Sequence, residues 1–451
     1  MRRVLPLVTP AVFFALVVLV AAQLSRQSSW PQVAHDAGLT KRAGVTGSQT
    51  GTLAPGFPTP VHVGSAPGFS LAGPPVVYVD GNLIAGMNPD QAPASDPVSQ
   101  LVAVNAAGVP FPGAVRVLFS DTGPLTATAG LTAATPAVTS SGLMFAASTS
   151  GHLWTVPPGG SATPTIALPP ATNGVGSPTI AADGTLYFTA GIGSATRSAA
   201  NKTLYGVNLS TGSISLAIPT TSIDAEIALD GAGNVYLTQR GRLRSVTAGG
   251  STRWTFTPPG RLRVVGPPMI YRGTAYVMVG RLSGSFPGPS YEDAAIVAVS
   301  TTSGKRSWTA PLDDGLFETT VNNAPGAQNG PALGTRGTVL GLTLNRLTAV
   351  SRSSGRKVWT YRLPPDLWAQ LSPMVDSSGD TYILAKPIAR AARGAVVAVN
   401  AKGHNLWRKN IQTYADTDIF TFNLTGDAIG VDGTIYVSAI DGLIWAFRDP
   451  S

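Results

Sequence analysis

The segment from residue 311 to residue 330, PLDDGLFETTVNNAPGAQNG, carries the densest group of side chains that could hold a metal ion. Its oxygen-bearing side chains are Asp313, Asp314, Glu318, Asn322 and Asn323, and Ca²⁺ takes carboxylate and amide oxygens as ligands. Their spacing matches no calcium-binding loop, in which ligands recur at fixed positions around a sharp glycine turn. Two interpretations stay open, a calcium site and a polar connecting loop, and we favour the loop.

Arginine is concentrated in one sector of the chain. Between Gly231 and Ser290 there is no Asp or Glu, but there are eight arginines: Arg240, Arg242, Arg244, Arg253, Arg261, Arg263, Arg272 and Arg281. Positive charge of this kind attracts acidic proteins, anionic polymers or lipid headgroups, although a solvated surface edge is the other interpretation. Residues 242 and 244 alternate along a predicted strand and share one face. The candidate partner-binding residues are Arg240, Arg242, Arg244, Arg261 and Arg263.

Other common kinds of site are not found in the sequence. The chain has no Cys, which excludes disulfides and thiolate chemistry. Its four histidines, His35, His62, His152 and His404, are scattered without ligand spacing. No nucleophile elbow, zinc helix or phosphate-binding loop motif occurs, and no nucleic-acid-binding motif is present. We therefore expect neither a hydrolase nor a nucleic-acid-binding protein.

A repeat organises the sequence after residue 70. A short apolar strand, a tight turn and a second strand recur in eight copies, as in SPTIAADGTLYFTA, GPPMIYRGTAYVMV and GDAIGVDGTIYVS. Each of the better copies continues with a second strand pair around a glycine turn, as in LTAVSRSSGRKVW. Asp-Gly and Ser-Gly pairs suit tight hairpins, so each repeat is two hairpins, or four antiparallel strands. Four-stranded units repeated radially form a β-propeller. We predict an all-β, eight-bladed propeller over residues 55–451.

The last copy is incomplete, because it supplies only three strands, at residues 427–431, 434–438 and 443–447. A propeller normally covers the edge that this leaves exposed. The segment PTPVHVG, residues 58–64, precedes the first repeat by about the distance at which fourth strands precede the other repeats. We predict that this N-terminal strand closes the last blade and pairs with residues 443–447.

The longest insertions all fall between the second and third strands of a blade, at residues 87–99, 191–202 and 280–293. These connections emerge on one face, and an elaborated face of a repeat protein often binds a partner. The third insertion, GRLSGSFPGPSYED, carries two aromatic residues, Phe286 and Tyr291. Aromatic residues frequently anchor interfaces, so both join the candidate partner-binding residues.

The N-terminus has the pattern of an export signal. Arg2 and Arg3 precede a nearly continuous apolar run from Val4 to Ala22, and small residues stand where a signal peptidase would cleave before Gln23. The run is also long enough to remain as a membrane anchor. We predict a signal peptide or anchor at residues 1–22, an extended lead-in segment at residues 23–54, and a body that lies outside the cytoplasm.

The repeats IVAVSTTSGKRSW, LTAVSRSSGRKVW and VVAVNAKGHNLW resemble those of the PQQ-like, or quinoprotein alcohol dehydrogenase-like, eight-bladed propellers, and SWPQVAHDAGLTKRAG resembles their lead-in segment. The resemblance covers about residues 29–451. It implies structural tryptophan docking at Trp254, Trp308, Trp359 and Trp407, with glycines 249, 304, 355 and 403 at the matching turn positions. Leu216 and Pro112 stand where two other blades would carry the tryptophan.

The family contains both enzymes and non-catalytic propellers, so the resemblance alone does not decide the function. Its enzymes bind pyrroloquinoline quinone (PQQ) and Ca²⁺, and often use a disulfide that this chain cannot form. No catalytic aspartate can be placed. In repeat type the chain also resembles the BamB-type propellers. We expect an exported, non-catalytic scaffold without cofactor that binds an envelope protein or an anionic envelope polymer. The alternative is a PQQ- and Ca²⁺-dependent alcohol or sugar dehydrogenase.

Overall fold

The computed structural model describes most of the repeat region and part of the lead-in segment. The described residues are 36, 42–54, 61–62, 69–71, 76–77, 82–89, 98–104, 115–122, 135–147, 152–158, 161–167, 176–192, 201–221, 227–284, 290–312, 317–318, 330–388, 393–411, 424–439 and 443–450. The predicted signal peptide or anchor, residues 1–22, lies outside them. Within the described part, no helix is long and apolar enough to cross a membrane.

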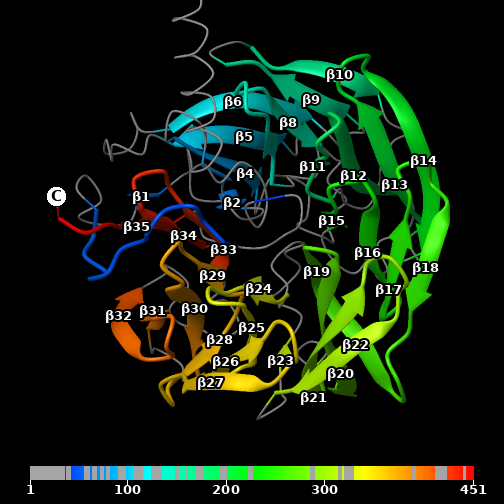
Figure 1. Ribbon diagram of the computed structural model, residues 1–451. Helices are drawn as coiled ribbons and strands as arrows, with labels where there is room; N and C mark the ends of the chain where they lie inside the picture. The colour runs from blue at the N-terminus through cyan, green and yellow to red at the C-terminus, as the bar shows by residue number, and fades with distance from the viewer. Residues whose placement is uncertain are drawn as a thin grey trace, which may run out of the picture.

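The described strands form a ring of antiparallel sheets, which follow one another around the ring in chain order (Figure 1). Eight sheets are present in the described residues, each with four strands in its main path. The prediction of an all-β propeller built from four-stranded antiparallel blades is confirmed. We number the sheets I to VIII in chain order.

Sheets I to IV come from the first half of the chain. Sheet I contains β2 (Phe69–Leu71), β3 (Val76–Val77), β4 (Leu83–Pro89), β5 (Val98–Val104) and β6 (Val115–Thr122). Sheet II contains β7 (Ala137–Val138), β8 (Met144–Ala147), β9 (His152–Val156) and β10 (Thr163–Ala167). Sheet III contains β11 (Thr179–Ile180), β12 (Thr185–Ile192), β13 (Asn201–Asn208) and β14 (Ser213–Thr221). Sheet IV contains β15 (Ala228–Leu229), β16 (Val235–Gln239), β17 (Arg242–Val246) and β18 (Thr252–Phe256).

Sheets V to VIII complete the ring. Sheet V contains β19 (Leu262–Tyr271), β20 (Thr274–Gly284), β21 (Ser290–Ser300), β22 (Arg306–Pro311) and β23 (Phe317–Glu318). Sheet VI contains β24 (Ala332–Leu333), β25 (Thr338–Leu342), β26 (Arg346–Ser351) and β27 (Lys357–Arg362). Sheet VII contains β28 (Leu367–Ala369), β29 (Met374–Val375), β30 (Thr381–Pro387), β31 (Gly394–Val399) and β32 (Asn405–Ile411). Sheet VIII contains β33 (Leu424–Ile429), β34 (Ile435–Ala439), β35 (Leu443–Phe447) and β1 (Val61–His62).

The antiparallel order gives the ring two different faces. Strands alternate in direction, so the turns between first and second strands and between third and fourth strands emerge at one end of every sheet. We call this end the turn face. The connections between second and third strands, and those from one sheet to the next, emerge at the other end, which we call the hairpin face. The predicted insertions belong to the hairpin face.

These insertions lengthen strands. In sheet III the pairing of β12 with β13 continues to Ile192 and Asn201, and in sheet V β20 and β21 remain paired as far as Gly284 and Ser290. Sheet I is extended in the same way, with Met87 opposite Gln100. Backbone pairing therefore continues into these insertions, and in sheet III the fourth strand follows it, with Thr221 opposite Asn201. The hairpin tips lie outside the described residues.

The ring is closed by a strand from the N-terminal part of the chain. Val61 pairs with Ile444 and His62 pairs with Leu443, both antiparallel. The predicted pairing of the N-terminal strand with residues 443–447 is therefore confirmed, over the two residues of β1. Its other predicted residues, 58–60 and 63–64, lie outside the described part. Strands β2 and β3 of sheet I contact β34 and β33 of sheet VIII, which joins the first sheet to the last.

The lead-in residues 42–54 form a second closing element, which the sequence analysis did not predict in detail. Arg42 bridges to Val375 in parallel, and Ser377 N donates to Val45 O at 2.9 Å, which fixes the start of the segment on sheet VII. Further along, Ala54 N donates to Ala446 O at 2.9 Å, which fixes its end on sheet VIII. The segment thus connects the last two sheets, and we call residues 42–54 the clasp.

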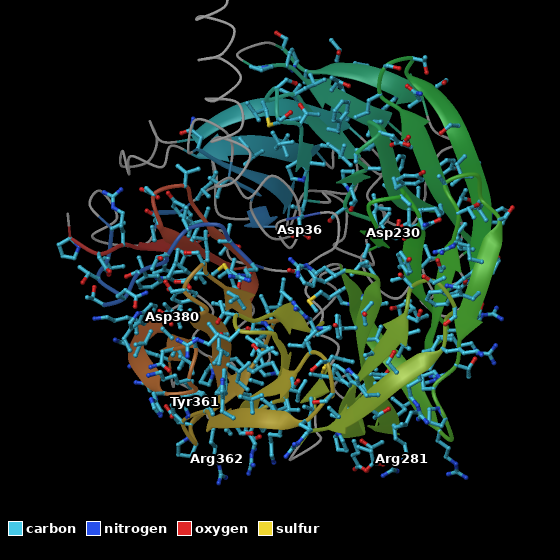
Figure 2. The ribbon with its side chains drawn as sticks, viewed as in Figure 1. Asp36, Asp230, Arg281, Tyr361, Arg362 and Asp380 are labelled. Atoms are coloured by element: carbon cyan, nitrogen blue, oxygen red, sulfur yellow. The ribbon has the colours of Figure 1, made fainter. Side chains whose placement is uncertain are left out.

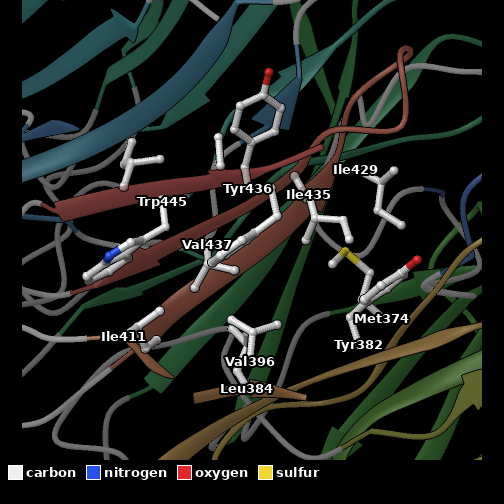
Figure 3. Packing of buried hydrophobic residues seen from close by; sticks show 14 of the residues in the cluster. Met374, Tyr382, Leu384, Val396, Ile411, Ile429, Ile435, Tyr436, Val437 and Trp445 are labelled. Carbon is white, nitrogen blue, oxygen red and sulfur yellow. The ribbon is translucent and has the colours of Figure 1, made fainter. Parts of the chain in front are cut away.

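A buried carboxylate holds the middle of the clasp. Asp376 is fully buried, and its Oδ2 accepts hydrogen bonds from Gly47 N at 2.8 Å and from the Tyr382 hydroxyl at 3.1 Å. Burial, opposed by these hydrogen bonds, raises the pKa of Asp376, while burial and the charge of Asp376 raise the pKa of Tyr382. The core beside it contains Met374, Tyr382, Ile435 and Trp445 (Figure 3). The clasp is therefore held by hydrogen bonds to a buried carboxylate that lies beside the apolar core.

The four predicted docking tryptophans link neighbouring elements. Each indole Nε1 donates to a carbonyl in a glycine turn: Trp254 to Thr301 O, Trp308 to Arg352 O, Trp359 to Ala401 O and Trp407 to Ser48 O, at 2.9–3.0 Å. A Cβ added at Gly304, Gly355, Gly403 or Gly51 would lie 2.7 Å from the respective indole. The glycine and tryptophan in contact therefore belong to successive sheets, because the third-to-fourth turn of one sheet covers the fourth strand of the preceding one.

The clasp supplies the turn that sheet VIII otherwise lacks. Gly51 has φ 63°, close to the φ of 68° at Gly304, and it lies against Trp407 as Gly304 lies against Trp254. The carboxylate of Asp449 caps this turn and accepts hydrogen bonds from Ser48 Oγ at 2.7 Å, Gln49 N at 2.9 Å and Thr50 N at 3.0 Å. Residues about 400 positions apart in sequence thus complete one turn.

We predict that Asp449→Ala will lower the free energy of unfolding by about 1–3 kcal/mol near neutral pH, because it removes an ionised acceptor from several donors. Burial alone would raise the pKa of Asp449, but the bonds from Gln49, Ser48 and Thr50 lower it. A lowered pKa stabilises the folded state above the unfolded value of about 4 and loses that effect below it. The difference between wild type and variant should therefore shrink as the pH falls below about 4, measured by urea denaturation.

Asp183→Ala is the control for this prediction. Asp183 caps a local turn by accepting a bond from Thr185 N at 2.9 Å and joins no distant segments. We expect its replacement to cost about 1 kcal/mol or less. An equal loss in both variants would contradict the role of Asp449 in closing the ring.

Candidate partner-binding site

The structure divides the predicted arginine sector into engaged and unengaged side chains. Arg244 donates to Thr252 Oγ1 at 2.7 Å, and Arg253 donates to the Tyr236 hydroxyl at 3.2 Å beside Asp230. Arg281 binds Asp293 and Glu292, each at 2.7 Å, and the hydrogen bond that it donates to Asp293 is the main cause that raises the pKa of Arg281. These three side chains are held by their neighbours, so Arg244 differs from the other candidate arginines.

Four exposed arginines remain: Arg240, Arg242, Arg261 and Arg263. In the described part of the chain, none of the four forms an ion pair or a side-chain hydrogen bond. Arg240 is in the turn between β16 and β17, and Arg242 begins β17. Arg261 immediately precedes β19, and Arg263 is its second residue. Both segments belong to the hairpin face. We call these four residues the arginine cluster.

Backbone contact between sheets IV and V brings the two halves of the cluster together. Val264 N donates to Gly241 O at 2.8 Å, and a Cβ added at Gly241 would lie 2.8 Å from Cβ of Arg263. Arg240 and Gly241 have φ values of 49° and 71°, so both turn residues adopt the left-handed conformation of a tight hairpin. A non-glycine residue in this conformation is uncommon. Here it places an arginine at the tip of the hairpin.

The nearest acidic side chains are already neutralised. Arg281 lies opposite Leu262 in the pairing of β19 with β20, one residue from Arg261 and Arg263. Glu292 and Asp293 are the two acidic residues of β21, and both bind Arg281. Figure 2 shows the position of Arg281. Among the described residues the arginine cluster therefore has no acidic counterpart, and its positive charge can pair with carboxylates of another molecule.

An exposed apolar side chain, Leu282, lies next to Arg281 on the hairpin of β20 and β21. Leu282 is 44% exposed and pairs with Tyr291, which is partly buried against sheet V. An exposed aliphatic side chain bordered by Tyr and Arg has the composition of an interface centre and rim. Phe286, the other predicted aromatic anchor, lies outside the described residues.

The candidate metal ligands are mostly outside the described part. Asp313, Asp314 and Asn322 are not described, and Glu318 is in β23, opposite Ser290 on β21. Among the residues that are described, no group of three or more His, Asp or Glu side chains could hold a metal ion. The two interpretations of this segment, a polar connecting loop, which we favour, and a calcium site, therefore both remain untested.

Sequence reasoning missed Asp376, Tyr382 and Asp449. One signal was available, because an Asp precedes a Tyr by six residues in both ALDGAGNVY and VDSSGDTY. In the first of these, the Tyr236 hydroxyl donates to Asp230 Oδ2 at 2.7 Å, which is the bond that Tyr382 makes to Asp376. Only the second pair also receives a backbone donor from the clasp.

Comparison with protein families identifies the repeat. Residues 215–450, which are 236 of the 451 residues, match the family described as outer membrane protein assembly factor BamB. The chain belongs to this family. The matched region contains the four docking tryptophans, the arginine cluster and the strands of sheets IV to VIII that pair within it. None of the curated proteins compared with the chain matches it.

Solved structures agree on the fold. BamB from Moraxella catarrhalis is 14% identical, with a TM-score of 0.50, and the match covers 87% of this chain and all of that one. The quinohemoprotein alcohol dehydrogenase of Comamonas testosteroni is 11% identical, with a TM-score of 0.60, covering 96% and 83%. A europium-containing methanol dehydrogenase is 10% identical, with a TM-score of 0.56, covering 93% and 91%. These likenesses establish a PQQ-like propeller, a fold that BamB shares with dehydrogenases.

Proposed function

We propose that this BamB-family chain is an exported, non-catalytic scaffold of eight blades, and that its arginine cluster binds an acidic segment of a protein in the cell envelope. The single observation that carries the proposal is the cluster itself. Arg240, Arg242, Arg261 and Arg263 meet across two blades, are exposed, and have no acidic partner in the described residues. The pattern of residues 1–22 and the family name support export to the envelope.

A protein partner fits this site better than an anionic polymer. Arginine presents a planar fork that pairs with carboxylates in a bidentate way, and Leu282 beside the cluster offers an apolar contact that a polymer of charged units would not use. The β16–β17 turn and the start of β19 carry the arginines and β20 carries Leu282, so both features belong to the hairpin face. A partner segment with two or more Asp or Glu residues next to an apolar side chain would match this arrangement.

We expect the variant that carries Arg240→Gln, Arg242→Gln, Arg261→Gln and Arg263→Gln to bind an acidic peptide at least about fourfold more weakly than wild type, since each of the four exposed ion pairs contributes roughly 0.2–1 kcal/mol. The probe is a fluorescent peptide with clustered Asp and Glu around one Leu, followed by anisotropy. Wild-type affinity should fall as salt is raised, because exposed charges are screened. Leu282→Ser should lower the affinity for the same peptide without changing how that affinity depends on salt.

Other results would contradict the proposal. Affinity that is unchanged in the arginine variant, or equal affinity for a glutamate polymer lacking Leu, would remove the protein-binding role of the cluster. Dye reduction by the wild-type protein with an alcohol, PQQ and Ca²⁺ would favour a quinone-dependent dehydrogenase. Recovery of the full chain from the cytoplasm alone would contradict export.

A further inference from the structure

A second basic surface lies on the opposite face of the ring, and we propose that it docks on an anionic lipid bilayer. It is formed by seven exposed residues in or next to the turns of sheets V, VI and VII: Arg272, Lys305, Arg306, Arg336, Arg356, Lys357 and Lys402. We call these residues the basic arc. The inference goes beyond the proposed function, because the arc belongs to the turn face and the arginine cluster to the hairpin face.

Exposed acidic side chains are missing from the same turns. The turns on this face of sheets V to VII span residues 271–274, 300–306, 334–337, 351–357, 376–380 and 399–405, and all of them are described. Their acids are Asp376 and Asp380, which are 0% and 7% exposed. Asp376 is bonded to the clasp, and Asp380 Oδ1 accepts from Ala401 N at 3.3 Å. The exposed Lys and Arg side chains of these turns are therefore not balanced by any exposed acid in the same turns.

The tryptophan contacts make the arc continuous. Gly355 lies on Trp308, so the turn that carries Arg356 covers the start of β22, where Arg306 lies. In the same way Gly403 lies on Trp359, which brings the turn of Lys402 to the start of β27 and Lys357. The Arg352 guanidinium stands 4.8 Å from the centre of the Tyr271 ring, and that of Arg272 stands 5.3 Å from it. Basic residues of each sheet thus lie next to basic residues of the following sheet.

The acids at the two ends of the arc are engaged. On the side of sheet IV, Asp230 accepts from Tyr236 and Asn234, with Arg253 at 3.9 Å. On the side of sheet VIII, Asp432 pairs with Arg448 and Asp449 caps the clasp turn. Among the described residues, neither end offers an unengaged carboxylate to the arc, so the arc as a whole carries a net positive charge.

The arrangement fits a flat anionic surface. Equivalent turns of successive blades emerge at the same end of their strands, so their cations lie close to one plane. Each Lys or Arg near an anionic membrane favours binding by roughly fivefold in partition. Val358, beside Lys357 in β27, is 55% exposed and adds an apolar side chain to this surface. A peptide partner would need one local cluster, as on the hairpin face, whereas a bilayer can engage separated charges across three sheets at once.

The test is partition into vesicles of phosphatidylcholine with and without phosphatidylglycerol, measured by co-sedimentation at low and high salt. The variant combines Lys305→Gln, Arg306→Gln, Arg356→Gln and Lys402→Gln in the full chain. We expect its partition into phosphatidylglycerol vesicles to fall by up to roughly six hundredfold, fivefold for each of the four residues, with no change on phosphatidylcholine alone. High salt should remove most of the wild-type binding.

The matched control is the four-fold arginine-cluster variant, which has the same net charge and also keeps residues 4–22. The arginine-cluster variant should partition into vesicles as the wild type does and should lose only its binding of the acidic peptide. The arc variant should still bind the peptide. Equal loss of vesicle binding in both variants would overturn the proposal, since net charge alone would then account for it. Wild-type binding to phosphatidylcholine that equals binding to phosphatidylglycerol would also overturn it. If the wild type binds phosphatidylglycerol vesicles through the arc but does not bind the acidic peptide, only the proposed function is rejected.

Discussion

Replacing Trp407 with alanine is expected to lower the free energy of unfolding by about 3–5 kcal/mol, the usual cost of removing a buried Trp. Trp407 is 7% exposed and packs against Tyr382 and Phe447, with ring centres 5.9 and 5.8 Å away. Its Nε1 donates to Ser48 O at 3.0 Å. The side chain therefore contacts sheets VII and VIII and the clasp at once, so its loss should loosen all three. Urea denaturation measures the change.

Trp308→Ala is the control for Trp407→Ala. Trp308 makes the same kind of contact, with Nε1 3.0 Å from Arg352 O and its ring 5.8 Å from Tyr276, but it is only partly buried and touches no terminal segment. We expect a smaller loss of stability. Hydrogen exchange separates the two roles: residues 42–54 should exchange faster in Trp407→Ala and remain protected in Trp308→Ala. Unchanged protection of these residues in both would show that Trp407 does not hold the clasp.

Gly403→Ala is expected to destabilise the protein by about 2–4 kcal/mol, through two separate effects. The φ of Gly403 is 84°, which costs an L-residue about 1 kcal/mol or more. In addition, a Cβ there would lie 2.7 Å from Cε3 of Trp359, and such overpacking typically costs about 1–3 kcal/mol. The indole would have to move away from the turn, which would weaken its bond to Ala401 O.

Gly212→Ala isolates the first of these effects. Gly212 lies at the corresponding turn of sheet III with φ 67°, but no atom lies within 4 Å of a Cβ added there. Its replacement should cost only the backbone strain, about 1 kcal/mol. Thermal denaturation of both variants gives the comparison, and equal shifts in Tm would contradict the packing role of the glycine at position 403.

The repeat could be predicted from the sequence because each blade obeys local rules. Alternating apolar residues and Asp-Gly or Ser-Gly turns specify hairpins within a few residues, and the gap left by the last three strands specifies a partner strand, which is Val61–His62. The clasp could not be predicted in this way. Residues 42–54, RAGVTGSQTGTLA, show no strand periodicity, and their position depends on carboxylates at 376 and 449.

The candidate site was predicted in part. Charge counting along the chain finds Arg240, Arg242, Arg261 and Arg263, but the side-chain partners of Arg244, Arg253 and Arg281 depend on cross-strand register. The basic arc was missed because its residues are far apart in sequence. Four of them do share repeat positions, since Lys305 and Arg306 follow Gly304 as Arg356 and Lys357 follow Gly355. Aligning the repeats and comparing the charge at each position would have found this part of the arc.

Closure by the clasp also sets the order in which the molecule can be completed. The carboxylate that caps the Ser48–Gly51 turn belongs to a residue 401 positions after Ser48. The clasp therefore cannot form this turn until residue 449 has been synthesised. Contacts of such long sequence separation form slowly. Until then the outer edge of β35 is unpaired and available to a neighbouring chain. Yield on refolding should consequently depend on protein concentration, with dilute conditions favouring intramolecular closure over intermolecular strand exchange.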